Sequence, residues 1–214
     1  MRILPFRSAR DIAAAVGPAT EHLQAGGTLA YPTETVYGLG CSPRREDLAS
    51  LARLKGRSED KPFLLLVTGR EMAEEWGLEF SDSAAALARA YWPGPLTLVL
   101  SPKSSKLPGS VRGPEGGVAV RWTGHRGIAR LIEHAGHPIT STSANRPGDP
   151  PAPDVAKIEL YFGDSENLLA LDGGVLQNQV PSTLVDCTRA MLRVIREGAI
   201  PQSDLRSTVD SLAP

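Results

Sequence analysis

The chain has 214 residues, of which 41% are hydrophobic and 22% charged, and 23 basic against 24 acidic residues leave a formal net charge of −1. This composition is ordinary for a folded globular protein and excludes disordered and fibrous chains, and the charge balance excludes a uniformly basic surface for nucleic acid. Apolar runs such as 63–67 are far shorter than the roughly 20 residues of a membrane-spanning helix. The N-terminus also lacks the apolar segment of a secretory signal, so we expect a cytoplasmic protein.

The predicted elements alternate between helices and strands along most of the chain. Ser8, followed three residues later by Asp11, is typical of a helix start, and apolar residues then recur at helical spacing as far as Leu23. The other expected helices cover 45–54, 70–76, 82–91 (capped by Ser81), 126–135 and 154–162. The expected strands cover 28–31, 63–67, 96–100, 117–121, 138–142, 168–171, 182–186 and 192–196.

The connections between these elements decide the fold class. Several strands are joined by turns that are too short for a helical crossover, which favours an α/β fold with a twisted, mixed sheet and flanking helices over a purely parallel sheet. Residues 146–153 are rich in proline and are expected to form a loop over the site, because the chain that follows is too short for a second core. We therefore expect a single domain over residues 1–214, with a motif-bearing core at about 26–198.

Several common site motifs are absent from the sequence. It contains no GxxxxGK[ST] phosphate loop, no complete GxGxxG and no GxSxG nucleophile elbow. His134 and His137 have no acidic or cysteine neighbours that would complete a metal site, and the two cysteines form no CxxC pair. The sequence therefore predicts neither a zinc site nor a dedicated nucleophile.

A cluster of cations forms the first candidate site. Lys55, Arg57 and Lys61 lie within seven residues, at the expected end of a helix and in the loop after it. Arginine binds oxyanions with two parallel hydrogen bonds and lysine adds a compact charge, so the cluster suits a polyphosphate or a carboxylate. Taken alone, it is equally typical of a solvated helix end.

Four further polar motifs lie at expected strand ends. They are PTETVYGLG at 32–40, Arg121 in GVAVR, STSAN at 141–145, and PSTLVD at 181–186 with Arg196 on the next strand. Small hydroxyls and amides can hold phosphate, ribose or an amino-acid head group, although each motif alone also suits a polar turn. Together with the cation cluster, they predict one basic cleft that is lined with hydroxyl groups.

In this order and at these spacings, the motifs closely resemble the YrdC/TsaC family of L-threonylcarbamoyladenylate synthases, over about residues 26–198. The chain is similar to the short, single-domain members of that family. The resemblance implies an α/β fold around a large, positively charged concave cavity. It also implies that L-threonine, bicarbonate and ATP, with Mg²⁺, give threonylcarbamoyl-AMP and pyrophosphate. A separate transferase complex would then use this product for the threonylcarbamoyladenosine (t6A) modification at A37 of tRNA.

The resemblance also assigns roles to individual residues. It implies that L-threonine is bound by Thr33, Arg121 and Ser141, that ATP is bound by Lys55, Arg57, Ser143, Asn145, Ser182 and Arg196, and that the catalytic cations are Lys55, Arg57 and Lys61. Arg146 would cover the nucleotide from its loop. Many relatives carry a histidine in the strand after the cations, where this chain has Leu66. Glu34 and Thr35 receive no assigned role.

Two other functions share part of this pattern. A double-stranded RNA or tRNA-binding module without adenylation activity would use a concave basic face, and an RNA affinity that falls steeply with salt, without ATP turnover, would favour it. For the synthase itself we expect at most weak RNA binding. The net charge of −1 and the aromatic content of 5% give that alternative little support. A carbamoyl-adenylate domain of the kind found in hydrogenase-maturation carbamoyltransferases is the other, but those proteins carry zinc-finger and acylphosphatase segments that this sequence lacks.

Overall fold

The structure is a computed structural model that describes residues 1–57, 61–103, 107–177 and 180–213. Its strands are β1 (Arg2–Pro5), β2 (Thr28–Tyr31), β3 (Gly38–Gly40), β4 (Leu64–Leu66), β5 (Leu78–Glu79), β6 (Leu96–Pro102), β7 (Val118–Arg121), β8 (Ile139–Ser143), β9 (Leu168–Asp172), β10 (Thr183–Asp186) and β11 (Arg193–Arg196). Its helices are α1 (Ala9–Gln24), α2 (Arg45–Lys55), α3 (Arg70–Glu75), α4 (Asp82–Tyr91), α5 (Arg126–Ala135), α6 (Val155–Phe162) and α7 (Gln202–Thr208), with one 3-10 turn at Gly109–Val111.

Local sequence signals set several of the helix starts. Ser8 accepts a hydrogen bond from the backbone N–H of Asp11, whose carboxylate accepts one from the N–H of Ser8, so a capping box opens α1 as predicted. The hydroxyl of Ser81 accepts from the N–H of Ala84 and caps α4, and the carboxylate of Asp154 accepts from the N–H of Lys157 and caps α6. The predicted helices are therefore confirmed, with their ends within a few residues of the expected ones.

The strands form one sheet with the order β1-β9-β2-β3-β8-β4-β7-β6-β10-β11, and β5 pairs with β6. Parallel pairs (β1/β9, β9/β2, β4/β7 and β6/β10) are mixed with antiparallel pairs (β2/β3, β3/β8, β8/β4, β7/β6 and β10/β11). The predicted mixed α/β sheet with flanking helices is confirmed. β4 lies between β8 and β7, a central position that suits the apolar run at 63–67.

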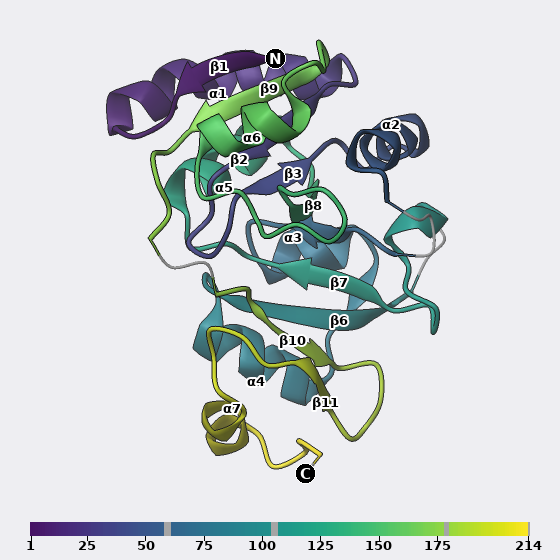
Figure 1. The fold of residues 1–214 in the computed structure, drawn as a ribbon. Helices are drawn as coiled ribbons and strands as arrows, with labels where there is room; N and C mark the ends of the chain where they lie inside the picture. The colour runs from purple at the N-terminus through teal and green to yellow at the C-terminus, as the bar shows by residue number, and fades with distance from the viewer. Residues whose placement is uncertain (58–60, 104–106, 178–179, 214) are drawn as a thin grey trace.

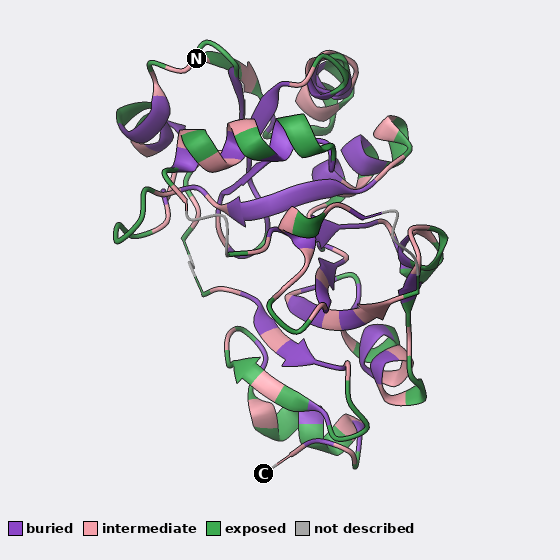
Figure 2. Cartoon of the chain, turned by 90° about the vertical axis from the view of Figure 1, so that its right-hand side faces the viewer, coloured by how far each residue is buried: buried purple, intermediate pink, exposed green. Residues whose placement is uncertain are grey.

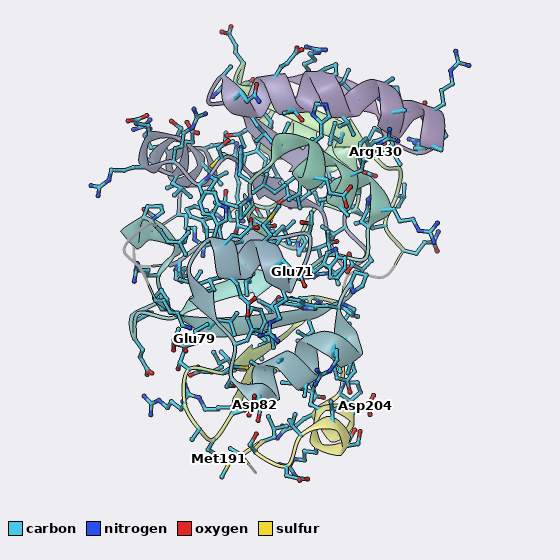
Figure 3. The ribbon with its side chains drawn as sticks, turned by 180° about the vertical axis from the view of Figure 1, so that it is seen from behind. Glu71, Glu79, Asp82, Arg130, Met191 and Asp204 are labelled. Carbon is cyan, nitrogen blue, oxygen red and sulfur yellow. The ribbon has the colours of Figure 1, made fainter. Side chains whose placement is uncertain are left out.

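Helices cover the two sides of the sheet unequally. Helices α1 and α5 pack together on one side of the upper half of the sheet, and α6 lies on the other (Figure 1). Seen from behind, α3 and α4 cover the lower half, and Glu71, Glu79 and Asp82 lie on this back side (Figure 3). The front of β7, β6 and β10 carries none of the described helices (Figure 1). Buried residues run through the middle of the sheet, whereas the edge strand β11 is largely exposed (Figure 2).

Five described elements were not expected from the sequence: β1, β3, β5, the 3-10 turn and α7. The strand β3 reads only GLG, so its local propensity is low, and it forms because both of its edges pair, with β2 and with β8. A Cβ on Gly40 would lie 1.9 Å from the backbone oxygen of Thr140. Glycine is thus what allows β3 to approach β8 so closely. Among the described helices, none has the length and apolar character needed to cross a membrane.

Candidate functional site

A cavity of about 550 Å³ lies on the uncovered face of β7, β6 and β10. Alternation along β6 shows how the strand separates the cavity from the core: Leu96, Leu98 and Leu100 are fully buried on the α4 side, whereas Thr97 and Val99 line the cavity. The same alternation brings Ala119 and Leu184 to the cavity from β7 and β10. The floor of the cavity is therefore largely apolar.

The predicted site residues divide into two groups. Those that line the cavity are Thr33, Arg57, Arg121, Ser141, Ser143, Ser182 and Arg196. Lys55, Lys61 and Asn145 lie outside this lining. The structure thus brings together residues from five separate stretches of chain, as the sequence predicted, and it gives the remaining three a different surrounding.

Thr33 and Thr35 order the turn between β2 and β3. The hydroxyl of Thr33 donates to the backbone oxygen of Val36 at 2.7 Å and accepts from the N–H groups of Thr35 and Val36. The two threonine hydroxyls are 2.9 Å apart, and since the proton of Thr33 is engaged by Val36, Thr35 donates to Thr33. The oxygen of Thr35 in turn accepts from Nη1 of Arg121 at 3.0 Å. Much of the polar character of PTETVYGLG therefore serves to fix this turn against Arg121.

Arg121 is the most enclosed cation of the cavity, with 4% of its surface exposed. Its Nε donates to the backbone oxygen of Gly94 at 3.0 Å, and its Nη2 lies 2.7 Å from Oε1 of Glu34 as an ion pair. The N–H groups of Nη2 are not aligned with that oxygen, and Nη2 has no hydrogen-bond partner among the described residues. Arg121 is thus held on several sides while donor capacity remains on its guanidinium.

Glu34 completes the network around Arg121. Its Oε2 accepts from the hydroxyl of Thr123 at 2.5 Å, and its Oε1 accepts from the backbone N–H of Gly124 at 2.8 Å. Burial acts to raise the pKa of Glu34, but the charge of Arg121 and these hydrogen bonds outweigh it and hold the pKa below its ordinary value. Glu34 is therefore a carboxylate at neutral pH.

Arg57 joins the loop after α2 to the strand β8. Its Nη1 donates to the hydroxyl of Thr142 at 2.7 Å, its Nη2 to the backbone oxygen of Pro62 at 2.7 Å and its Nε to that of Lys61 at 3.0 Å. The guanidinium also lies 4.9 Å from the ring centre of Phe63. Arg57 lines the cavity, whereas the exposed Lys61 contributes a backbone oxygen to this arrangement. Residues 58–60, between the two cations, lie outside the described residues.

Lys55 is buried behind the cavity wall, where it holds the STSAN loop. Its ammonium group donates to the backbone oxygen of Ser143, and to the backbone oxygen and Oδ1 of Asn145 at 2.9 and 2.8 Å. Ser143 also donates to Oδ1 of Asn145, at 2.6 Å. Burial and the charge of Arg57 lower the pKa of Lys55 to about 8. In this structure Lys55 holds the loop by these hydrogen bonds. Its influence on the cavity is therefore indirect, through Ser143 of the same loop, which lines the cavity.

The opposite wall comes from the start of β10 and from β11. Arg196 donates from Nη2 to the backbone oxygen of Ser182 at 2.8 Å, and the hydroxyl of Ser182 lies 2.8 Å from that of Thr97. Arg146, which was expected to cover the nucleotide, is exposed and donates from Nε and Nη2 to the backbone oxygen of Tyr161 instead. Its guanidinium is thus directed at the C-terminal part of α6.

The cavity contains charges and surfaces that the motifs did not reveal. Arg193 also lines it, so four guanidiniums face two carboxylates, Glu115 and Asp186, and the lining carries an excess of positive charge. The apolar floor was missed as well. Its signal is the spacing of two in segments such as Ser182, Leu184 and Asp186, which reads as an ordinary half-buried strand. Leu66, the residue in place of the histidine of many relatives, lines the wall as an apolar side chain.

Metal ligands and nucleophiles can be judged from the same residues. Within the described ranges, no group of three or more His, Cys, Asp or Glu side chains is placed to hold a metal ion. Cys41 and Cys187 are both buried, and burial raises the pKa of each thiol to about 12, so neither supplies a thiolate at neutral pH. The arrangement is suited to binding anions and polar head groups beside an apolar surface.

Comparisons with known proteins agree with this geometry. Residues 21–198 match the Sua5/YciO/YrdC family, which carries the description "Telomere recombination". A Thiobacillus denitrificans protein named threonylcarbamoyl-AMP synthase is 40% identical over 166 residues, which are 77% of this chain and 87% of that protein. A Pyrococcus abyssi protein of the same name is 34% identical over 196 residues, which are 91% of this chain and 57% of that protein.

A solved structure of a protein with a similar sequence shares the fold of this chain. The structure of Pyrococcus abyssi Sua5 complexed with L-threonine matches with a TM-score of 0.88 at 31% identity, and the match covers 100% of this chain and 63% of the Sua5 chain. This chain therefore spans less than two thirds of the length of the Pyrococcus protein. The family match over residues 21–198, the two relatives and the shared fold lead to one conclusion: the chain belongs to the Sua5/YciO/YrdC family.

Proposed function

We propose that this protein is a threonylcarbamoyl-AMP synthase. The observation that carries the proposal is the cavity, in which Arg57, Arg121 and Arg196 face the hydroxyls of Ser141 and Ser182 beside an apolar floor. Such a lining suits a substrate set with a triphosphate, a carboxylate and a purine base. The names of the relatives, and the L-threonine in the Pyrococcus structure, support this assignment and give no support to an RNA-binding module.

The proposed reaction has two steps. The amine of L-threonine attacks bicarbonate, which gives a carbamate and releases water. A carbamate oxygen then attacks the α-phosphorus of ATP, the bond to the β-phosphate oxygen breaks, and pyrophosphate leaves with that electron pair. The products are threonylcarbamoyl-AMP and pyrophosphate, and the reaction needs no nucleophile from the protein.

The positive charges of the cavity lower the electrostatic cost of bringing the two anionic reactants together. Carbamate and triphosphate are both anions, so bringing them together in a partly enclosed site costs Coulombic repulsion. Guanidiniums that are already fixed by hydrogen bonds, as Arg57 and Arg196 are, offset this repulsion without further reorganisation. We assign the threonine side to Thr33, Arg121 and Ser141, and the ATP side to Arg57, Ser143, Ser182 and Arg196.

Lys55 and Asn145 serve the ATP side in this proposal by holding the loop that carries Ser143. Lys61, which is exposed and follows directly after residues 58–60, remains a proposed catalytic cation; residues 58–60 lie outside the described residues. Mg²⁺ enters with ATP as part of the substrate. This fits the donor set: the two cavity carboxylates are engaged, Glu115 with Arg189 at 2.8 Å and Asp186 with the hydroxyl of Thr188 at 2.6 Å, and Mg²⁺ is commonly held through nucleotide phosphates.

Residues 1–214 act as a single catalytic domain in this proposal, and the site of action is the cytoplasm. The product is an activated acyl donor, and a separate tRNA threonylcarbamoyl transferase complex would consume it for t6A modification at A37.

A reconstitution assay tests the proposed activity. Purified protein incubated with L-threonine, labelled bicarbonate and MgATP should form threonylcarbamoyl-AMP and pyrophosphate, detected by mass spectrometry and by release of pyrophosphate. Omission of any one substrate should abolish the product. Absence of product with all substrates present would refute the synthase, and RNA binding that falls steeply with salt would then favour the RNA-binding module.

Paired lysine substitutions link the activity to the cavity. Arg57→Lys keeps the positive charge but cannot bridge Thr142 and Pro62, so kcat/KM for ATP should fall by about tenfold or more. Arg53→Lys is the matched control, because Arg53 lies on α2, just before the loop that carries Arg57, and its guanidinium donates to the hydroxyl of Ser50 on the same helix. Equal activity of the two variants would remove Arg57 from the site.

A further inference from the structure

Glu34 belongs to the site but does not line the cavity. It comes from the turn between β2 and β3. Among the described residues its carboxylate contacts Arg121, which lines the cavity, and the hydroxyl of Thr123 and the N–H of Gly124, which do not. The last two belong to the turn that follows β7 and leads into α5. One carboxylate thus joins two turns of the chain, since Thr123 and Gly124 lie 89 and 90 residues after Glu34.

These contacts leave little room for a role in proton transfer. Both carboxylate oxygens already accept short hydrogen bonds, at 2.5 and 2.8 Å, and the guanidinium of Arg121 lies at 2.7 Å. The same contacts hold the pKa of Glu34 below its ordinary value, so it is a poor acceptor for a substrate proton at neutral pH. Its remaining chemical effect is on Arg121.

The effect on Arg121 is directional. An arginine has five N–H groups, and here Nε is directed to Gly94 and one N–H of Nη1 to Thr35. Glu34 stands beside Nη2 on a third side, so the guanidinium plane is fixed from three directions. The N–H groups that remain belong to Nη1 and Nη2. Nη2 is buried beside Glu34 and has no hydrogen-bond partner among the described residues, so the free N–H of Nη1 is the group left to meet a ligand in the cavity that Arg121 lines.

We propose that Glu34 is a positioning residue, which fixes the rotation of Arg121 so that its terminal nitrogen Nη1 meets the carboxylate of the amino-acid substrate. This inference rests on the proposed function, because it takes the substrate of Arg121 to be an amino acid. The length of the Glu34 side chain matters more than its charge, since length sets where its oxygens meet Arg121, Thr123 and Gly124 together.

Three variants separate length from charge. Glu34→Gln keeps the length and an oxygen facing Arg121 and Gly124, whereas Glu34→Asp keeps the charge but withdraws it by one methylene, and Glu34→Ala removes both. Titration calorimetry with L-threonine should give a Kd within about threefold of wild type for Glu34→Gln. It should give a Kd at least about tenfold weaker for Glu34→Asp and Glu34→Ala, because a misplaced contact group loses most of its orientation benefit. The Kd for ATP should stay within about twofold in all three.

Glu74→Asp is the matched control. Glu74 also contacts a guanidinium at 2.7 Å, that of Arg70, but the pair lies on the exposed surface of α3. Threonine affinity should be unchanged in this variant. In an Arg121→Lys background, Glu34→Asp should cause no further loss of threonine affinity, because a residue that acts through Arg121 has no effect once Arg121 is replaced.

The outcomes distinguish this inference from the proposed function. A Glu34→Asp protein that binds threonine as well as Glu34→Gln does, or that loses ATP and threonine affinity equally, overturns the positioning role. If the wild-type protein binds no L-threonine, the proposed function fails. The positioning of Arg121 by Glu34 can then still be tested by ¹⁵N NMR, through the Nε–H signal of Arg121, which is assigned by its loss in Arg121→Lys. That signal should persist in Glu34→Gln and shift or broaden in Glu34→Asp; an unshifted signal in Glu34→Asp refutes the inference.

Discussion

At the scale of single residues, several polar side chains of the site hydrogen-bond or ion-pair with other protein groups and so fix the positions of neighbouring loops and side chains. The hydroxyl of Thr33 is engaged by its own turn, Glu34 by Arg121, and the ammonium of Lys55 by the loop at 143–145. A buried cation whose hydrogen bonds within the described residues all go to neutral oxygens, as those of Lys55 do, also makes the protein sensitive to pH. The sign of that effect follows from the pKa of Lys55.

The pKa of Lys55 is about 8 in the folded protein, below its ordinary value of 10.5, because of burial and the charge of Arg57. Below pH 8 both the folded and unfolded states hold the proton; between pH 8 and 10.5 the unfolded state binds more protons, so the free energy of unfolding rises with pH. Urea unfolding should therefore show wild type gaining stability relative to Lys55→Met over this range, by at most about 3 kcal/mol. Parallel curves for the two proteins would contradict the lowered pKa.

At the scale of elements, the close approach of β3 to β8 connects two of the cavity walls, since Gly38 and Ser141 both line the cavity. The backbone oxygen of Thr140 would lie 1.9 Å from a Cβ on Gly40, and the hydroxyl of Tyr31 2.9 Å from it. Neither strand can shift easily to make room for a Cβ, because β3 is paired with β2 and β8, and β8 is paired with β3 and β4.

Gly40→Ala should therefore lower the free energy of unfolding by about 2–3 kcal/mol or more, through overpacking against the backbone of β8. Gly17→Ala is the matched control: a Cβ there meets nothing within 4 Å, and alanine at this position inside α1 should stabilise by about 0.5–1 kcal/mol. Thermal or urea unfolding of both variants checks the pair. Equal stability would mean that β3 and β8 are free to separate.

The elements also show what the sequence can predict. The start of α1 was predictable because Ser8 and Asp11 satisfy each other within one turn of chain. The strand β3 was not, because GLG has no strand propensity of its own and is held by partners at 28–31 and 139–143. The sequence grouped the cations at 55 and 57 in one cluster, but Arg57 lines the cavity and Lys55 does not, and this difference depends on which side of α2 meets the loop at 143–145. That contact has a sequence separation of 88, which no local pattern encodes.

At the scale of the whole molecule, the mixed sheet places polar and apolar parts of the cavity side by side. Because β7 runs antiparallel to β6 and β6 parallel to β10, the end of β7 with Arg121 adjoins the starts of β6 and β10 with Thr97 and Ser182. The sequence predicted polar groups at strand ends, and this topology explains why they gather at one place. The apolar floor that continues from them was invisible in the motifs, because a strand residue facing a ligand and one facing a core are both apolar.

Ligands that bind in the cavity should raise the free energy of unfolding of the whole protein. At concentrations about 100 times their Kd, a ligand that binds only the folded state adds about 2.7 kcal/mol. MgATP should therefore raise the Tm of wild type by roughly 5–10 °C, given about 2–4 °C per kcal/mol for a chain of this size. Calorimetry or differential scanning fluorimetry checks this, with GTP as the comparison. No shift with ATP at saturating concentration would speak against a nucleotide site in the cavity.

The residues that line the cavity come from a span of chain that begins at Thr33 and ends at Arg196, about three quarters of its length. During synthesis, the wall that carries Thr33 leaves the ribosome long before the floor strands and the arginines of β11 that face it. A nascent chain stopped before β11 can bury much of its core but has no complete site. Substrate binding therefore cannot assist the early stages of folding, and the elements that precede β11 in the chain must form without a bound substrate.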